Sequence, residues 1–254
     1  MKKYLIVFIF SIWIFFSLAI GYSFNSWWKF IPSTLLIIIT TYVMYPGRYQ
    51  ELLGIKIARR DIGIALGLCV IFFLLSRFLI EITLAEKGYY LSWGYWLDYM
   101  ATPFQALNEE FVFRALLLTA LLQLGVNKWK SIFIPALIFT IFHWIFYHFN
   151  MTLENRGDLD IAALSSIFLF GVATNSIFLA TRSVAIPWAL HCGWNLNRFG
   201  SKIIPLEGAD HLNLREYMTF NLLEGAWPIM LLSLLVAATS VFYFSGYSRC
   251  KMKT

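Results

Sequence analysis

Long apolar runs separated by short polar stretches fill the chain from end to end. A helix that crosses a bilayer needs about 20 mostly apolar residues, within a range of roughly 17 to 25. Eight segments meet or approach this length, and they run near residues 4–20, 31–45, 62–84, 101–125, 131–148, 161–181, 184–200 and 224–246. The pattern therefore predicts an all-α fold, a polytopic membrane bundle of about eight transmembrane helices.

The polar stretches between these segments are of loop size. The longest lie near residues 46–61, 85–100, 149–160 and 201–223, and no internal repeat or low-complexity tract divides the chain. We therefore expect residues 1–254 to form a single integral membrane domain. Its motif-bearing core lies at about residues 100–200.

The composition strengthens the membrane interpretation and narrows the partners. Hydrophobic residues make up 59% of the chain and charged residues only 13%, far from the mixture of a soluble domain. The net charge of +6 comes from lysines and arginines of the predicted loops, which suit anionic lipid headgroups. The lipid bilayer is therefore an expected partner, and nucleic acid is not.

Basic residues also predict the orientation, because they concentrate on the cytoplasmic side of short loops. With the N-terminus inside, twelve lysines and arginines fall on the inner side and five on the outer side. Both termini are therefore predicted to be cytoplasmic. The first segment, which has a basic start, could instead be a cleaved secretory signal. We expect a retained helix, because its apolar stretch is longer than the usual core of a signal.

Three ionisable residues interrupt the fourth segment, in the stretch "ALNEEFVFRALLLTALL" at residues 106–122. A charge in the middle of a bilayer costs about 2.5–3.5 kcal/mol on insertion scales, so it usually has a partner or a function. Glu110 and Arg114 are four residues apart, which predicts a supporting ion pair on one helical face. Glu109 is rotated about 100° from Glu110 on an α-helix and has no such partner, so it is a candidate for catalysis.

Two further polar clusters lie in the fifth and seventh segments. His143 stands among aromatic residues in "FTIFHWIFYH", and His191 shares a helical face with Asn195 in "WALHCGWNLNRF". Each cluster alone fits an ordinary buried hydrogen-bonding group. At a rise of 1.5 Å per residue, however, all three helices carry their polar groups within about two turns of one level, near the midplane. We therefore expect one shared polar cavity.

A carboxylate, two imidazoles and a carboxamide in one cavity are suited to hydrolysis. Removing water from a carboxylate disfavours its charged form, so that it can accept a proton from a bound water. Imidazole and amide N–H groups can stabilise the oxyanion of a tetrahedral intermediate. The hypothesis is that Glu109 is the base, that His143 helps to hold the water, and that His191 and Asn195 form the oxyanion hole.

The stretches "NEEFVFR", "FTIFH" and "HCGWN" resemble the three motifs EExxxR, FxxxH and HxxxN of the CPBP or Abi family of intramembrane proteases. That family includes the type II CAAX prenyl endopeptidases and bacterial relatives linked to bacteriocin self-immunity. The resemblance covers roughly residues 100–200. It implies an eight-helix bundle and assigns catalysis to Glu109, His143, His191 and Asn195, with Glu110 and Arg114 supporting them.

The resemblance leaves the cofactor and the substrate open. A Glu with two His could bind zinc, but a metal-free mechanism without a cofactor is favoured, because the amide of Asn195 suits an oxyanion hole better. We expect an intramembrane endopeptidase of a bacterial inner membrane that acts on a membrane-associated or lipidated peptide or protein. The alternative is a non-catalytic immunity protein or scaffold that binds such a partner.

Overall fold

The computed structural model describes residues 30–57, 59–94, 96–149, 160–199, 201–205 and 225–251. The predicted segment 4–20 lies outside the described residues. The other seven predicted segments each coincide with a helix. These helices are α2 (Phe30–Met44), α4 (Arg59–Ala85), α5 (Trp96–Glu109), α7 (Lys128–Phe149), α8 (Ile161–Thr181), α9 (Ala185–Phe199) and α11 (Trp227–Lys251).

The fourth segment is longer than an ordinary α-helix and changes its winding. α5 continues directly into the π-helix η2 (Glu110–Leu117) and then into the short α-helix α6 (Leu118–Gln123). A further short helix, α3 (Tyr49–Leu52), lies between α2 and α4. A π-helix inside an α-helix is rare and frequently marks a functional site.

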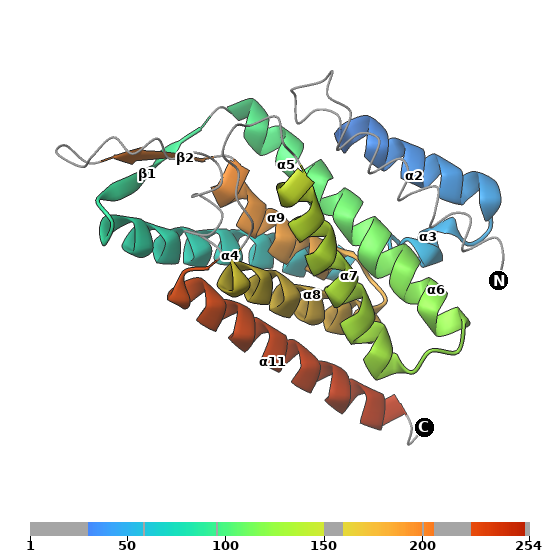
Figure 1. The fold of residues 1–254 in the computed structure, drawn as a ribbon. Helices are drawn as coiled ribbons and strands as arrows, with labels where there is room; N and C mark the ends of the chain where they lie inside the picture. The colour runs from blue at the N-terminus through green and yellow to red at the C-terminus, as the bar shows by residue number, and fades with distance from the viewer. Residues whose placement is uncertain are drawn as a thin grey trace.

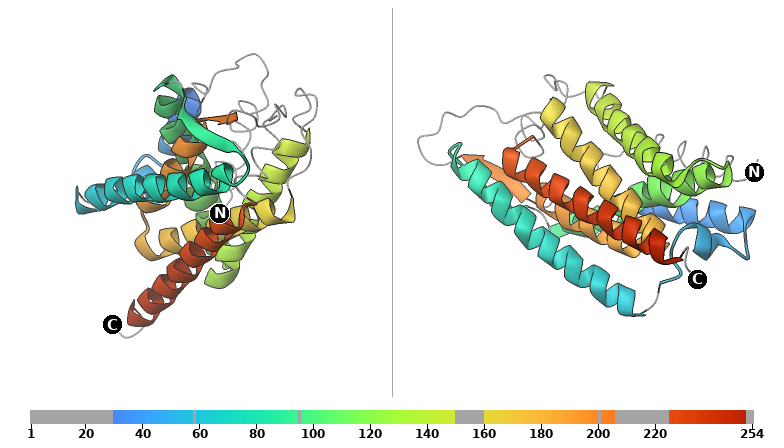
Figure 2. Two further views of the ribbon diagram at one scale, coloured as in Figure 1. Left: turned by 90° about the vertical axis from the view of Figure 1, so that its left-hand side faces the viewer. Right: turned by 90° about the horizontal axis from the view of Figure 1, so that it is seen from below.

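The helices form a bundle in which α9 and α8 lie at the centre (Figure 1). α9 packs against α4 and α5, while α8 packs against α7 and α11, and α2 covers the outer side of α5. Figure 2 shows α4 and α11 as long helices on the outside of the bundle. The segments that carry the three sequence motifs therefore meet inside the bundle.

Glycines allow two of these helix pairs to approach closely. A Cβ atom added to Gly193 of α9 would lie 2.7 Å from the carbonyl oxygen of Cys69 on α4. A Cβ atom added to Gly171 of α8 would lie 3.0 Å from Cα of Ala136 on α7. Small residues at such crossings are typical of membrane helices, because they let the backbones come into contact.

Two of the predicted loops contain strands, which the sequence analysis did not expect. β1 (Tyr89–Trp93) pairs antiparallel with β2 (Ser201–Pro205), with Leu91 opposite Ile203. β1 follows α4 and β2 follows α9, so the close packing of these two helices brings the strands together. The sheet packs on Ile80, Leu84 and Ile229 at one end of the bundle.

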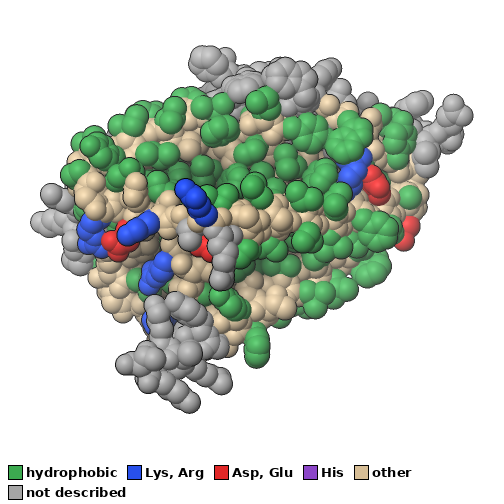
Figure 3. All heavy atoms as spheres, turned by 180° about the vertical axis from the view of Figure 1, so that it is seen from behind, with side chains coloured by type: hydrophobic (Ala, Val, Ile, Leu, Met, Phe, Trp, Pro, Cys, Tyr) green, Lys and Arg blue, Asp and Glu red, His purple; other side chains and the backbone are tan. Residues whose placement is uncertain are grey.

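Three helices among the described residues are long and apolar enough to cross a membrane, at Asp61–Ala85, Ile161–Thr181 and Trp227–Ser245. Helix α2 is apolar but has only 15 residues. Figure 3 shows that hydrophobic side chains cover the middle of one face and that charged side chains lie toward its ends. A surface of this kind suits a bilayer. The protein is thus predominantly helical and apolar, and the number of eight spans stays a prediction.

Candidate active site

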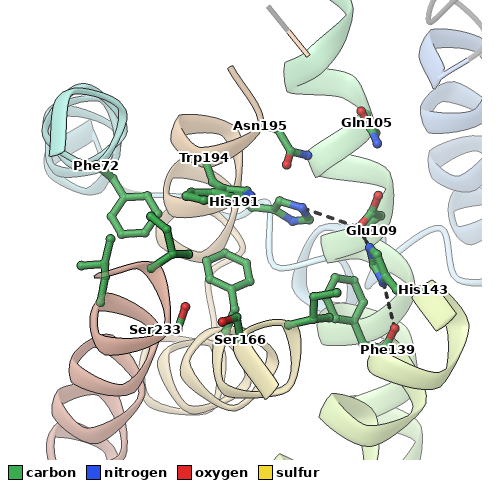
Figure 4. A pocket seen from close by; sticks show the side chains of 14 residues that line it. Phe72, Gln105, Glu109, Phe139, His143, Ser166, His191, Trp194, Asn195 and Ser233 are labelled. Carbon is green, nitrogen blue, oxygen red and sulfur yellow. Dashed lines mark hydrogen bonds and ion pairs between the residues drawn. The ribbon is translucent and has the colours of Figure 1, made fainter. Parts of the chain in front are cut away.

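Helices α5, α7 and α9 bring the four predicted catalytic residues to one cavity, as the level of their polar groups indicated (Figure 4). Glu109 comes from α5, His143 from α7, and His191 with Asn195 from α9. The cavity has a volume of about 70 Å³, which is enough for a few water molecules. Glu109, His191 and Asn195 are buried, and His143 is partly buried.

The change from α-helix to π-helix occurs between the two adjacent glutamates. Glu109 is the last residue of α5, and Glu110 is the first residue of η2. The turn of a π-helix is wider than that of an α-helix, so successive side chains are rotated less from one another. The sequence analysis assumed an α-helix and separated the two side chains by about 100°. In the structure both carboxylates reach the same imidazole, that of His191.

Glu110 does more than pair with Arg114. Its Oε2 atom lies 3.2 Å from Nε of Arg114, as predicted, and both side chains are fully buried. Its Oε1 atom lies 2.8 Å from Nδ1 of His191. An ionised carboxylate only accepts hydrogen bonds, so Nδ1 of His191 carries the proton and donates it. Glu110 therefore fixes the orientation of His191 and turns Nε2 toward Glu109.

Arg114 is held in place from two other helices. Its Nε atom donates to Oγ1 of Thr174 on α8 at 3.0 Å, and its guanidinium lies over the ring of Phe139 on α7, 4.2 Å from the centroid. Thr174 in turn donates to the carbonyl oxygen of Phe170 at 3.0 Å. A continuous polar chain thus runs from Thr174 through Arg114 and Glu110 to His191.

The imidazole of His143 has its orientation set by its own helix. Nδ1 lies 2.8 Å from the carbonyl oxygen of Phe139, and a carbonyl only accepts, so Nδ1 is the protonated nitrogen. Its Nε2 atom then faces Oε2 of Glu109 at 3.9 Å, while Nε2 of His191 lies 3.6 Å from the same oxygen. His191 is therefore as close to Glu109 as His143 is, whereas the sequence hypothesis paired Glu109 with His143 alone.

One face of helix α9 lines the cavity, and another face packs against α4. His191 and Asn195, four residues apart, line the cavity. Gly193 and Asn197 lie against α4, where Nδ2 of Asn197 donates to the carbonyl oxygen of Phe73 and to Oγ of Ser76, both at 2.7 Å. The polar contacts to α4 therefore fix the rotation of α9 and hold its other face toward the cavity.

The far end of the cavity is apolar. Figure 4 shows Phe72 of α4 and Trp194 of α9 there, with Ser166 and Ser233, and Phe170 of α8 and Leu232 of α11 also line the cavity. A polar end with a carboxylate and an apolar end of this kind are typical of sites that bind an amphipathic or apolar ligand. The sequence analysis did not identify these residues, because apolar residues in a membrane helix carry no distinguishing pattern.

The structure also shows a polar contact beside the site that the sequence analysis overlooked. Asn108, fully buried, donates from Nδ2 to the carbonyl oxygen of Phe30 at 2.8 Å and accepts from Oγ of Ser33 at 2.9 Å. These bonds join α2 to α5 at the residue directly before Glu109. A buried asparagine beside "EE" is a signal that could have been found, since it cannot be left without hydrogen bonds in a membrane.

Three donors for a metal ion lie near one another, namely the carboxylate of Glu109 and Nε2 of His143 and His191. Among the described residues, however, no group of three or more His, Cys, Asp and Glu has an arrangement that could hold a metal ion. The zinc alternative therefore gains no support from the geometry.

Comparison with known families agrees with the motifs. Residues 91–197 match the family described as "Type II CAAX prenyl endopeptidase Rce1-like". The matched region covers less than half of the chain but contains all three motifs and the six residues discussed above. Neither the comparison with curated proteins nor that with solved structures finds a match.

Proposed function

We propose that the chain is an intramembrane endopeptidase, since residues 91–197 match the family described as type II CAAX prenyl endopeptidase Rce1-like. In this proposal Glu109 activates a water molecule that hydrolyses a peptide bond. The observation that carries the proposal is the convergence of Glu109, His143, His191 and Asn195 on one buried cavity. The match to a protease family supports the class of reaction.

The two imidazoles have different hydrogen-bonding capacities, and this supports different roles. Because Nδ1 of His143 donates to a carbonyl, its Nε2 in the neutral ring can only accept. A water molecule between Nε2 of His143 and Oε2 of Glu109 can donate one hydrogen to each. A water held in this way has its lone pair turned away from both groups and available for attack.

His191 is suited to stabilising negative charge. Nδ1 of His191 donates to the carboxylate of Glu110, so Nε2 faces the cavity and can donate there when it carries a proton. The side-chain amide of Asn195, one turn further along α9, supplies a second donor. Two donors of this kind can stabilise the oxyanion that forms when a carbonyl is attacked.

The proposed reaction needs no group beyond these four side chains and water. Glu109 takes a proton from the water as its oxygen bonds to the carbonyl carbon, and the carbonyl oxygen becomes an oxyanion held by His191 and Asn195. Collapse of this intermediate breaks the C–N bond. Glu109 returns the proton to the departing nitrogen, which leaves a carboxylic acid and an amine, and transfer of the acid's proton to the amine gives the carboxylate and the ammonium products.

The apolar end of the cavity supports a substrate that carries a large apolar group near the cleaved bond. The helices that surround the site are themselves apolar on the outside, so a substrate associated with the membrane has the shortest path to it. We therefore propose a membrane-associated or lipidated peptide or protein as substrate, in an eight-span bacterial inner-membrane protein with both termini in the cytoplasm. Peptide processing linked to bacteriocin immunity is the corresponding biological role.

The experiment that tests this function is cleavage of a quenched-fluorescence peptide library by the purified protein in detergent. Wild type is compared with Glu109→Ala and Glu109→Gln, each with and without a chelator. Glu81→Gln is the matched control, because Glu81 is a glutamate of α4 that pairs with Arg77 at 2.8 Å and does not line the cavity. We expect cleavage by wild type and Glu81→Gln, in chelator as well, and none by the two Glu109 variants.

Other outcomes point to other functions. Activity that disappears in chelator would make the site a metal site. A wild-type protein that cleaves no peptide, in cells where Glu109→Ala still supports its physiological role, would replace the enzyme with a binding scaffold.

A further inference from the structure

Gln105 is a buried polar residue of the cavity that none of the three motifs contains. It lies on α5 four residues before Glu109, so the two side chains share one face of the helix. Its side chain is one of those that line the cavity, and only 9% of the residue is exposed. Figure 4 shows Gln105 on the same side of Glu109 as Asn195, which comes from the facing helix α9.

Gln105 is one of three amides whose side-chain oxygen is buried without a hydrogen-bond partner among the described residues, and it is the one of the three that lines the cavity. Asn175 and Asn197, whose Oδ1 atoms are also unpaired, lie outside the cavity lining and donate from Nδ2 to neighbouring helices. An acceptor that is buried without a partner is costly, and the cost is recovered when a donor binds. The position of Gln105 therefore indicates that a ligand in the cavity supplies this donor.

An extended peptide is a ligand that supplies such a donor next to a carbonyl. Its main chain presents N–H and C=O groups in alternation, and a carboxamide can accept from one and donate to the other. Glu109 and Asn195 already define where the attacked carbonyl would lie. One helical turn from Glu109, Gln105 would face the main chain of a residue beside the cleaved bond.

We propose that Gln105 binds the main chain of the substrate, with Oε1 accepting a hydrogen bond from a peptide N–H group that flanks the cleaved bond. This inference rests on the proposed function, because it assigns a main-chain-binding residue to the same site. It accounts for a buried acceptor that has no hydrogen-bond partner among the residues that the structure describes. A hydrogen bond from Gln105 to the substrate main chain would favour extended peptides whatever the side chains of the substrate are.

The test removes the hydrogen-bonding group from the protein side chain in one set of proteins and from the peptide main chain in one set of substrates. Wild type and Gln105→Met, which keeps the length of the side chain but loses the amide, cleave a peptide and a set of analogues. In each analogue one flanking N–H is replaced by an ester oxygen, while the cleaved bond stays an amide. Gln50→Met is the matched control, since Gln50 is an exposed residue of α3 outside the cavity.

We expect wild type and Gln50→Met to cleave one of the analogues with a kcat/KM about tenfold lower than that for the peptide. This difference corresponds to the loss of one hydrogen bond. Gln105→Met should cleave the peptide about tenfold more slowly and should no longer distinguish it from that analogue. A second variant, Gln105→Leu, and thermal unfolding of each protein separate this effect from loss of the fold.

Two results would overturn the inference, and they differ from each other. If Gln105→Met cleaves the peptide as fast as wild type, or keeps the wild-type preference for the peptide over every analogue, Gln105 does not bind the main chain and the proposed function stands. If wild type cleaves no peptide at all, the proposed function fails and this inference fails with it.

Discussion

At the scale of single residues, the two adjacent glutamates make different contacts. Glu109 faces both imidazoles of the cavity, while Glu110 lies between Arg114 and His191 and is completely buried. A buried charge of this kind is stable only while its partners are present. In the proposed mechanism Glu110 orients His191, so the loss of Glu110 should affect folding as well as catalysis.

The ion pair predicts how charge removal changes stability. Glu110→Gln leaves Arg114 without its buried counter-charge and should lower the free energy of unfolding by about 3–5 kcal/mol. The double variant Glu110→Gln/Arg114→Met removes both charges and should recover part of this loss. Thermal unfolding in detergent measures both effects. A double variant that is less stable than Glu110→Gln would contradict the ion-pair interpretation.

Thr174 extends the same polar chain to a third helix and can be tested separately. Thr174→Val has nearly the same shape but removes the acceptor for Nε of Arg114, so it should cost about 1–3 kcal/mol of stability. Thr174→Ser keeps the hydroxyl and should recover most of the loss. The rate of peptide cleavage should also fall more in Thr174→Val than in Thr174→Ser. In Thr174→Val, kcat should fall by a larger factor than KM rises, because the proposed role of His191 is in the transition state. Equal behaviour of the Val and Ser variants would contradict this chain.

At the scale of elements, most helices were predicted within a few residues from the apolar runs alone. The segments 31–45 and 161–181, for example, correspond to α2 at Phe30–Met44 and α8 at Ile161–Thr181. This success has a simple cause, since a helix in a membrane must satisfy its own backbone hydrogen bonds and therefore follows hydrophobicity closely. The convergence of the polar clusters was predictable for the same reason, because a regular rise per residue gives the level of each side chain.

Two elements could not be predicted, for a shared physical reason. The π-helix η2 and the β1–β2 sheet both depend on contacts with distant parts of the chain. The strands pair across more than 100 residues of sequence, and no local pattern reports the partner. The widened turn at Glu110 accompanies contacts to α8 and α9, through Thr174 and His191. The polar residues that line the cavity were therefore predicted from the sequence, but the contact of Glu110 with His191 was not.

The close crossing of α4 and α9 leads to a prediction at this scale. Gly193→Ala places a methyl group 2.7 Å from the carbonyl oxygen of Cys69 and should force the helices apart, at a cost of about 1–3 kcal/mol. Since His191 and Asn195 are on the same helix, peptide cleavage should fall as well. Gly67→Ala on α4 is the matched control, because no atom lies within 4 Å of the added carbon. Comparable unfolding temperatures for the two variants would argue against this crossing.

At the scale of the whole molecule, the bundle combines an apolar exterior with a polar interior cavity. The exposed residues of α4 include Val70, Leu74 and Phe78, whereas the charged residues of the site are buried between helices. Large apolar side chains exposed in this number are unusual for a soluble protein and fit a membrane-embedded one.

The proposed topology can be checked at the two ends of α4. With the N-terminus in the cytoplasm, the loop before α4 lies inside and the turn after it lies outside. In a protein whose native cysteines are replaced, Glu86→Cys should react with a membrane-impermeant maleimide in intact cells. Gly47→Cys should react only after the membrane is permeabilised. Reaction of both variants from the same side would show that α4 does not cross the membrane.

The most direct test of the central claim is the single-turnover rate at which Glu109→Gln cleaves a peptide that wild type cleaves. The glutamine keeps the size and the burial of the side chain but cannot take a proton from water, so the account predicts a rate at least about 10³-fold lower, with unchanged peptide binding and an unchanged unfolding temperature. A folded Glu109→Gln protein that cleaves the peptide at the wild-type rate would contradict the claim that Glu109 activates the water.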